Sequence, residues 1–432
     1  MIELIIATFV IGYLAIALEH PIHINKAASA LITGVLCWTI YIMMGNHSDP
    51  HEVVGQLEHF ISEVASILFF LLGAMTIVEL VDAHEGFKVI TDKITTTSKV
   101  KLLWIISFVA FFFSAVLDNL TTSIVMVSLL RKLIDDKHDR MFFAGMVVVA
   151  ANAGGAWSPI GDVTTTMLWI GGQITAGNIV ATLIIPSIVC LMAPLIILSF
   201  TLKGEVTRPS EVVKTGHHSA KVNSTERNIV FYTGLGGLLF VPIFKTVTHL
   251  PPFMGMLFSL GVLWVLTELL HKSKNDEDKE AATVVGVIRR IDTPSVLFFL
   301  GILVAIGSLQ ATGVLSNLAQ TLDETIGNQN LIVLAIGLLS SVVDNVPLVA
   351  AAMKMYSLEQ FPQDDPFWEF LAYAAGTGGS CLIIGSAAGV AVMGMEKIDF
   401  FWYLKKIGLL ALVGYLAGAG VYLLTYPFFA IH

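Results

Sequence analysis

Two aspartate–asparagine pairs lie at the centre of long apolar segments. Asp118-Asn119 is followed by Leu-Thr-Thr-Ser, and Asp344-Asn345 is followed by Val-Pro. A carboxylate at the centre of a lipid bilayer is costly unless it is paired or solvated, and such residues usually mark an ion or proton pathway. Carboxylate and amide oxygens are also the ligands that a hard cation prefers. The two pairs therefore predict a cation site at membrane depth.

Two further apolar segments are interrupted by runs rich in glycine. The first run is Asn152-Ala-Gly-Gly-Ala-Trp-Ser-Pro-Ile-Gly-Asp162, followed by Thr164, and the second is Gly376-Thr-Gly-Gly-Ser380. Gly and Pro release backbone carbonyls from helical hydrogen bonds, and unwound carbonyls near the midplane coordinate Na⁺ or H⁺ in secondary transporters. The side chains predicted to bind the ion are Asp118, Asn119, Asn152, Asp162, Thr164, Asp344, Asn345, Thr377 and Ser380.

The three aspartates of these segments could bind Na⁺ and also carry protons. Removal from water favours the protonated form of a carboxyl group, so Asp118, Asp162 and Asp344 could exchange a proton for Na⁺ near neutral or alkaline pH. No Lys or Arg lies in the four polar breaks of these segments, and an anionic substrate would therefore meet three carboxylates. A simpler role stays open for each aspartate, because Asp and Asn are favoured N-caps and each precedes a predicted half-helix.

Two other acidic residues each precede a similar apolar run. Glu63 precedes Val-Ala-Ser-Ile-Leu-Phe-Phe, and Asp292 precedes Thr-Pro-Ser-Val-Leu-Phe-Phe. Both are predicted to open a membrane span, where an acidic side chain stabilises the helix N-terminus. Their positions also fit a proton or ion path that leads to the site. The sequence leaves both roles open.

The composition indicates that these segments belong to an integral membrane protein. Of the 432 residues, 55% are hydrophobic and only 13% are charged, against about 25% charged in soluble proteins. Segments 101–133 and 328–356 have polar centres and predict re-entrant hairpins. The spans at 141–169 and 367–395 are predicted to be broken near the midplane. The expected fold is an all-α polytopic membrane protein with about ten spans, at 2–18, 26–45, 63–82, 141–169, 178–202, 228–247, 253–270, 293–313, 367–395 and 403–427.

The chain also contains a weak internal repeat, at an offset of about 225 residues. Ser114-Ala-Val-Leu-Asp-Asn119 matches Ser340-Ser-Val-Val-Asp-Asn345, and two Gly-Gly pairs match at the broken spans. Each half holds an odd number of crossings, so the second half must enter the membrane from the opposite side. We therefore predict inverted repeats, an architecture of secondary transporters, with repeat 1 at 1–202, a cytoplasmic linker at 203–227 and repeat 2 at 228–432.

The basic residues divide between the two sides of this layout. When the loop after the first span is placed in the cytoplasm, every Lys and Arg except Lys245 and Lys354 falls on the cytoplasmic side. That distribution obeys the positive-inside rule. It predicts a multi-pass protein of the inner (plasma) membrane with both termini outside, and it leaves no Lys or Arg in the middle of a span.

Three parts of the sequence together resemble the NhaD-type sodium/proton antiporters of the ion transporter superfamily. They are the run Phe70-Leu-Leu-Gly-Ala-Met-Thr-Ile-Val-Glu-Leu-Val-Asp-Ala-His84, the two Asp-Asn tips and the run 152–162. The resemblance implies a homodimer with scaffold and transport domains, an elevator-like movement, and exchange of Na⁺, and also Li⁺, for protons. It implies ion-binding roles for Asp118, Asn119, Asn152, Asp162, Thr164, Asp344 and Asn345, and less securely for Ser380, Glu63 and Asp292.

The function expected from these features is secondary antiport of Na⁺ and H⁺ at a shared carboxylate site. No enzyme activity, cofactor or nucleic-acid partner is predicted, and the lipid bilayer is the expected surroundings. One alternative is a sodium-coupled anion symporter of the same fold, although dicarboxylate symporters of the superfamily carry Ser where this chain has Asp at the tips. Another is a membrane aspartyl protease, which would need Asp118 and Asp344 to share one water and lacks a Gly-x-Gly-Asp context.

Overall fold

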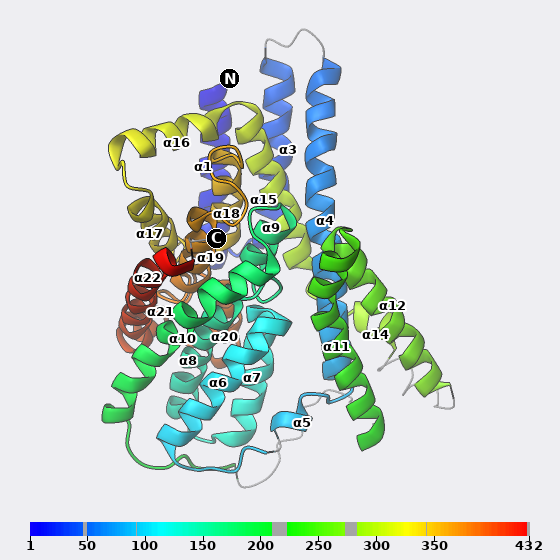
Figure 1. Cartoon of the computed structure of the whole chain (residues 1–432), viewed down its shortest axis with the longest axis vertical. Helices are drawn as coiled ribbons and strands as arrows, with labels where there is room; N and C mark the ends of the chain where they lie inside the picture. The colour runs from blue at the N-terminus through cyan, green and yellow to red at the C-terminus, as the bar shows by residue number, and fades with distance from the viewer. Residues whose placement is uncertain (46–49, 92, 210–222, 273–282, 343, 430–432) are drawn as a thin grey trace.

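The structure, a computed structural model, describes residues 1–45, 50–91, 93–209, 223–272, 283–342 and 344–429. Regular structure in these residues is helical (Figure 1), apart from one isolated β-bridge between Ser98 and Glu205. Among the described residues, eight helices are long and apolar enough to cross a membrane. The all-α, multi-pass prediction is therefore confirmed.

The first half of the chain builds helices whose starts are marked by polar residues. Asn25, Asp136 and Thr175 each accept a hydrogen bond from a backbone N–H of the helix that follows, as favoured N-caps do. The helices are α1 (Ile2–Ala17), α2 (Glu19–Ile22), α3 (Lys26–Met44), α4 (Pro50–Ala83), α5 (Lys88–Thr91), α6 (Lys99–Leu117), α7 (Asn119–Leu133), α8 (Lys137–Ala156), α9 (Val163–Ile170) and α10 (Ala176–Thr201).

The second half repeats this order of long, paired and broken helices. In both halves, each segment predicted as a hairpin or a broken span contains two helices. The helices are α11 (Ser224–Thr248), α12 (Pro252–His271), α14 (Val284–Ile288), α15 (Thr293–Ala311), α16 (Val314–Thr325), α17 (Gln329–Leu339), α18 (Asn345–Met355), α19 (Pro366–Gly378), α20 (Ala387–Glu396), α21 (Phe400–Tyr403), the π-helix η1 (Leu404–Gly408) and α22 (Leu409–Phe429).

Two features differ from the sequence prediction. The prediction that Glu63 opens a span is wrong, because α4 begins at Pro50 and Glu63 lies inside it. Hydropathy marks only the apolar part of a helix, and nothing after Pro50 stops the helix from continuing through polar residues. The second difference is α16, an amphipathic helix too polar to be recognised as a span. Of the predicted linker at 203–227, residues 210–222 lie outside the described part of the chain.

Glycine lets the broken helices approach the hairpin arms in both halves. A Cβ atom added to Gly154 of α8 would lie under 3.0 Å from the Phe111 carbonyl oxygen of α6. The corresponding Gly378 of α19 meets the Gly337 carbonyl oxygen of α17 in the same way. Any larger side chain would have to displace backbone, which is packed too densely to yield cheaply. These contacts hold the broken segments against one arm of each hairpin.

Replacing Gly378 by Ala is therefore expected to destabilise the protein. Overpacking typically costs about 1–3 kcal/mol, which should lower the unfolding temperature of the purified protein in detergent. The matched control is Gly394→Ala in α20, where an added Cβ meets nothing within 4 Å. Gly→Ala at a compatible helical position stabilises by about 0.4–1 kcal/mol. Equal unfolding temperatures for the two variants would contradict the close approach.

Candidate functional site

Asp118 forms the break between α6 and α7. Its φ angle is +78° with ψ at 159°, a region that is essentially restricted to Gly and costs about 1–3 kcal/mol for other residues. Its carboxylate caps α7, because Oδ1 accepts from the Thr121 backbone N–H at 2.8 Å and Oδ2 accepts from the Thr121 hydroxyl at 2.8 Å. Backbone strain held at one acidic residue is a feature of functional sites. The expected capping role is present, and it does not exclude ion binding.

Asp162 lies at the centre of a buried polar network. It caps α9, since Oδ1 accepts from the Thr164 N–H at 2.9 Å and from the Thr164 hydroxyl at 2.7 Å. Its second oxygen accepts from Asn119 Nδ2 at 2.5 Å, and the same Nδ2 donates to Asn152 Oδ1 at 3.0 Å. All four of these residues are buried. The residues at the first hairpin tip and those of the first broken span therefore belong to one buried network.

Asn152 extends this network into the second half of the chain. Its Nδ2 donates to Ser380 Oγ at 2.9 Å and to Ser386 Oγ at 3.0 Å. Ser386 also caps α20 by accepting from the Gly389 N–H at 3.2 Å. Ser386 is not among the side chains that the sequence predicts to bind the ion. The repeat could have revealed it, because Ser386 occupies the place in the second broken helix that Asp162 occupies in the first.

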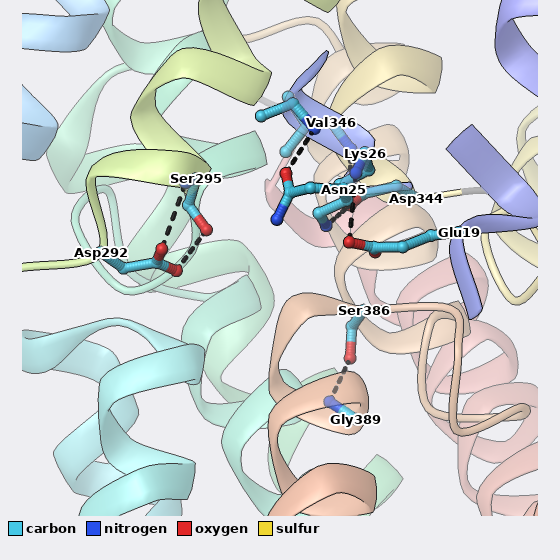
Figure 2. A network of polar contacts seen from close by, with 10 residues as sticks. Glu19, Asn25, Lys26, Asp292, Ser295, Asp344, Val346, Ser386 and Gly389 are labelled. Atoms are coloured by element: carbon cyan, nitrogen blue, oxygen red, sulfur yellow. Dashed lines mark hydrogen bonds and ion pairs between the residues drawn. The ribbon is translucent and has the colours of Figure 1, made fainter. Parts of the chain in front are cut away.

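Asp344 is paired with a cation that the sequence did not assign to the site. Lys26 Nζ, from the first residue of α3, lies 3.3 Å from Asp344 Oδ2 and 4.4 Å from the centre of the Phe298 ring. The other carboxylate oxygen accepts from the Val346 N–H at 3.2 Å and caps α18. Figure 2 shows Asn25 and Lys26 at the start of α3 beside Asp344. A Lys and an Asp far apart in the sequence thus share one partly exposed ion pair.

The two hairpin tips converge on Asp162. Asn345 is buried and its side chain lies beside the Asp162 carboxylate, although its Nδ2 donates to no acceptor among the described residues. Asp162 is within electrostatic range of Asp118 on one side and of Asp344 on the other. Three carboxylates and several amide and hydroxyl oxygens therefore lie in one region. Such a set of oxygens suits a hard monovalent cation that replaces protons.

Three predicted residues stand outside this network. Thr377 is buried, but its hydroxyl donates to the Tyr373 carbonyl of its own helix at 2.6 Å. Glu63 pairs with Lys354 at 2.6 Å and is 45% exposed. Asp292 caps α15 and bonds to the backbone and hydroxyl of Ser295, as Figure 2 shows. For Asp292 the helix-cap alternative accounts for every contact the structure gives it.

Asp118 also lines a small cavity. The cavity has a volume of about 20 Å³, enough for one water molecule. Its wall is apolar except near Asp118 and Thr166, and α4 and α12 contribute Phe70, Met75 and Met256 to it. A water molecule in this cavity would therefore sit between the hairpin tip and these two long helices.

Two buried carboxylates were missed by the sequence analysis and lie outside the network. Glu369 of α19 accepts from Asn178 Nδ2 and, at 2.8 Å, from the Tyr422 hydroxyl. Glu396, the last residue of α20, pairs with Arg131 at 2.7 Å and with Arg140 at 2.8 Å. Both groups join helices of the two halves and have their hydrogen-bonding needs met, which fits structural roles.

The chain is similar to known transporters along most of its length. Residues 13–368 match the citrate transporter family, CitMHS. Sodium/proton antiporter 2 of Arabidopsis thaliana is 46% identical over 97% of this chain and 99% of its own length. Sodium/proton antiporter 1 of the same plant is 50% identical over 96% of this chain and 71% of its own. The Na⁺/H⁺ antiporter NhaD of Vibrio cholerae is 31% identical over 96% of this chain and 90% of its own length.

A solved structure has the same fold. The YdaH transporter of Alcanivorax borkumensis superposes with a TM-score of 0.61 over 94% of this chain and 99% of its own. The two sequences are only 11% identical, so this likeness concerns the arrangement of helices and not the substrate.

Proposed function

The chain belongs to the citrate transporter family and, within it, to the NhaD-type sodium/proton antiporters, and we propose from this that it exchanges Na⁺ for H⁺ as a secondary active antiporter. The observation that supports this most strongly is the buried network around Asp162. It joins Asn119 of one hairpin tip, Asn152 of the broken helix and serines of the second half. A site assembled from both halves can be exposed to either side in turn when the halves move.

The proposed mechanism uses one set of carboxylates for both substrates. In the deprotonated state Asp118, Asp162 and Asp344, with amide and hydroxyl oxygens nearby, would hold Na⁺. Protonation removes the charge that binds the metal ion, so a proton taken up on the opposite side expels it. Because the two substrates exclude one another at the same oxygens, transport of one requires return of the other. No separate gate is needed to enforce the exchange.

The movement we propose is of the elevator type, in a homodimer of the plasma membrane with both termini outside. The helices that carry the network, α6–α10 and α17–α22, would move against a scaffold formed by α1, α3, α4, α11, α12 and α15. The Lys26–Asp344 pair crosses that boundary, since Lys26 belongs to α3 and Asp344 to the tip before α18. It would break and re-form once in each transport cycle.

A second candidate function follows from two specific observations. The matching family is described as citrate transporters, and Lys26 places an ammonium group beside Asp344. A carboxylate substrate could use that ammonium, which would make the protein a sodium-coupled anion symporter. Three carboxylates in the same region would repel such a substrate, so we favour antiport.

The deciding measurement uses purified protein in liposomes with an imposed pH gradient. Addition of Na⁺, and also of Li⁺, should dissipate the gradient, whereas choline should leave it unchanged. Vesicles prepared in parallel should show no Na⁺-dependent uptake of labelled citrate. If citrate enters with Na⁺ while the pH gradient persists at every pH, the symporter replaces the antiporter as the function.

A further inference from the structure

A second polar cluster lies away from the ion site, where three long helices end together. His84 directly follows the last residue of α4, Glu226 lies in the first turn of α11, and His271 is the last residue of α12. Figure 1 shows α4, α11 and α12 together on one side of the molecule. Both histidine side chains are buried, and the Glu226 side chain is 11% exposed. The proposed transport mechanism gives these groups no role.

The ligand atoms of the three residues converge on one point. His84 Nε2 and His271 Nε2 are 3.1 Å apart, His271 Nε2 and Glu226 Oε1 are 2.5 Å apart, and His84 Nε2 and Glu226 Oε1 are 3.9 Å apart. A triangle with these sides has a centre about 2.0 Å from every corner, which is the length of a Zn–N or Zn–O bond. In a tetrahedral zinc site the ligand atoms are about 3.3 Å from one another. Each of the three observed distances differs from this value by less than about 1 Å, so only small shifts of the ligand atoms are needed.

The two imidazole rings are oriented to share a ligand. They are nearly parallel, with 6° between their planes and 5.0 Å between centroids. Since the two Nε2 atoms are much closer than the centroids, the rings meet through these nitrogens and do not lie face to face. His84 Nδ1 lies 2.7 Å from the Leu80 carbonyl oxygen, which can only accept, so Nδ1 carries the hydrogen. The lone pair of His84 Nε2 then points at the cluster, as in metal-bound histidines held by an outer hydrogen bond.

We propose that His84, Glu226 and His271 form a binding site for one borderline divalent metal ion of the Zn²⁺ type, which ties the ends of α4, α11 and α12 together. Two imidazole nitrogens and one carboxylate oxygen are a ligand set that Zn²⁺ uses, with a fourth position left for water. The 11% exposure of Glu226 gives the ion a way in from solvent. Imidazole ligands disfavour Na⁺ here, because hard cations prefer oxygen. The site is thus distinct from the transport site.

The test is metal binding by the full-length protein, purified with a tag that contains no histidine and stripped with a chelator. We expect the wild type to retain about one Zn²⁺ per chain after desalting, to unfold at a higher temperature with Zn²⁺, and to give the visible absorption of tetrahedral Co²⁺ when Co²⁺ is used. His84→Gln and His271→Gln should weaken Zn²⁺ binding by at least about 100-fold, since even outer-shell changes cost roughly 10–100-fold.

The control is His249→Gln at the opposite end of α11, which should bind Zn²⁺ like the wild type. A wild-type protein that retains no Zn²⁺ would overturn the proposal, whatever the variants do. Binding that persists in both cluster variants would also overturn it. If either histidine variant fails to fold, Glu226→Gln at the partly exposed position provides the same comparison. None of these outcomes depends on transport activity.

Discussion

Replacing Asp162 by Asn should abolish Na⁺-driven proton movement in liposomes, with a loss of at least about 100-fold. Asp162 is buried and accepts hydrogen bonds from Thr164 and Asn119, and its charge would hold Na⁺ in the proposed mechanism. The amide keeps the shape of the side chain and one acceptor oxygen, but it has neither the charge nor a site to take up a proton. Hydrogen bonds and contacts to a charged group contribute about 1.5–3 kcal/mol, and a factor of 100 corresponds to about 2.7 kcal/mol.

The matched control is Asp292→Asn, because Asp292 is also an N-cap but, among the described residues, its carboxylate bonds only to Ser295. Asn caps helices about as well as Asp, so this variant should keep at least half of the wild-type exchange rate. Both proteins should elute as single species and unfold at temperatures close to that of the wild type. Exchange that survives in Asp162→Asn would remove Asp162 from the ion site. Loss of exchange in Asp292→Asn would restore Asp292 to the proton path.

The arrangement of helices was largely predictable because each signal is local. Apolar length fixes where a helix can cross a bilayer, and the polar break at Asp118 and the Gly-rich runs mark where helices must end. The Asp162 cap could also be predicted, since the Asp precedes an apolar run with Thr two residues later. The likeness of the halves then placed Asn152 and Ser380 in one site, because corresponding breaks in two repeats meet near a common axis.

The contacts that could not be predicted all join residues far apart in the sequence. The positive-inside rule places Lys26 among the cytoplasmic cations and gives it no acidic partner, whereas the fold brings it to Asp344. The partner of Glu63 is Lys354, near the end of α18. His84, Glu226 and His271 come from three helices, and no spacing along the chain suggests a common ligand. Such pairings depend on how helices pack, and hydropathy carries no information about that.

Replacing Asp344 by Asn is expected to lower Na⁺-driven proton movement by at least about 10-fold, and the pair with Lys26 gives two possible reasons. Asp344 would bind Na⁺ directly in the proposed mechanism, with the Lys26 ammonium taking the place of the ion when the site is empty. Alternatively, Asp344 serves only to neutralise Lys26, and the variant fails because a partly buried ammonium loses its counter-ion. The single substitution cannot separate these causes, since both predict a loss.

The variants Lys26→Met and Lys26→Met/Asp344→Asn separate the two causes. If the ammonium competes with Na⁺, Lys26→Met alone should remain active and reach half-maximal exchange at a lower Na⁺ concentration. The shift should be at most about 5-fold, because a partly exposed pair contributes up to about 1 kcal/mol. The double variant should be as slow as Asp344→Asn, since the carboxylate that holds Na⁺ is still missing. Recovery of exchange in the double variant would show that Asp344 only balances Lys26, and the site would then consist of Asp118 and Asp162.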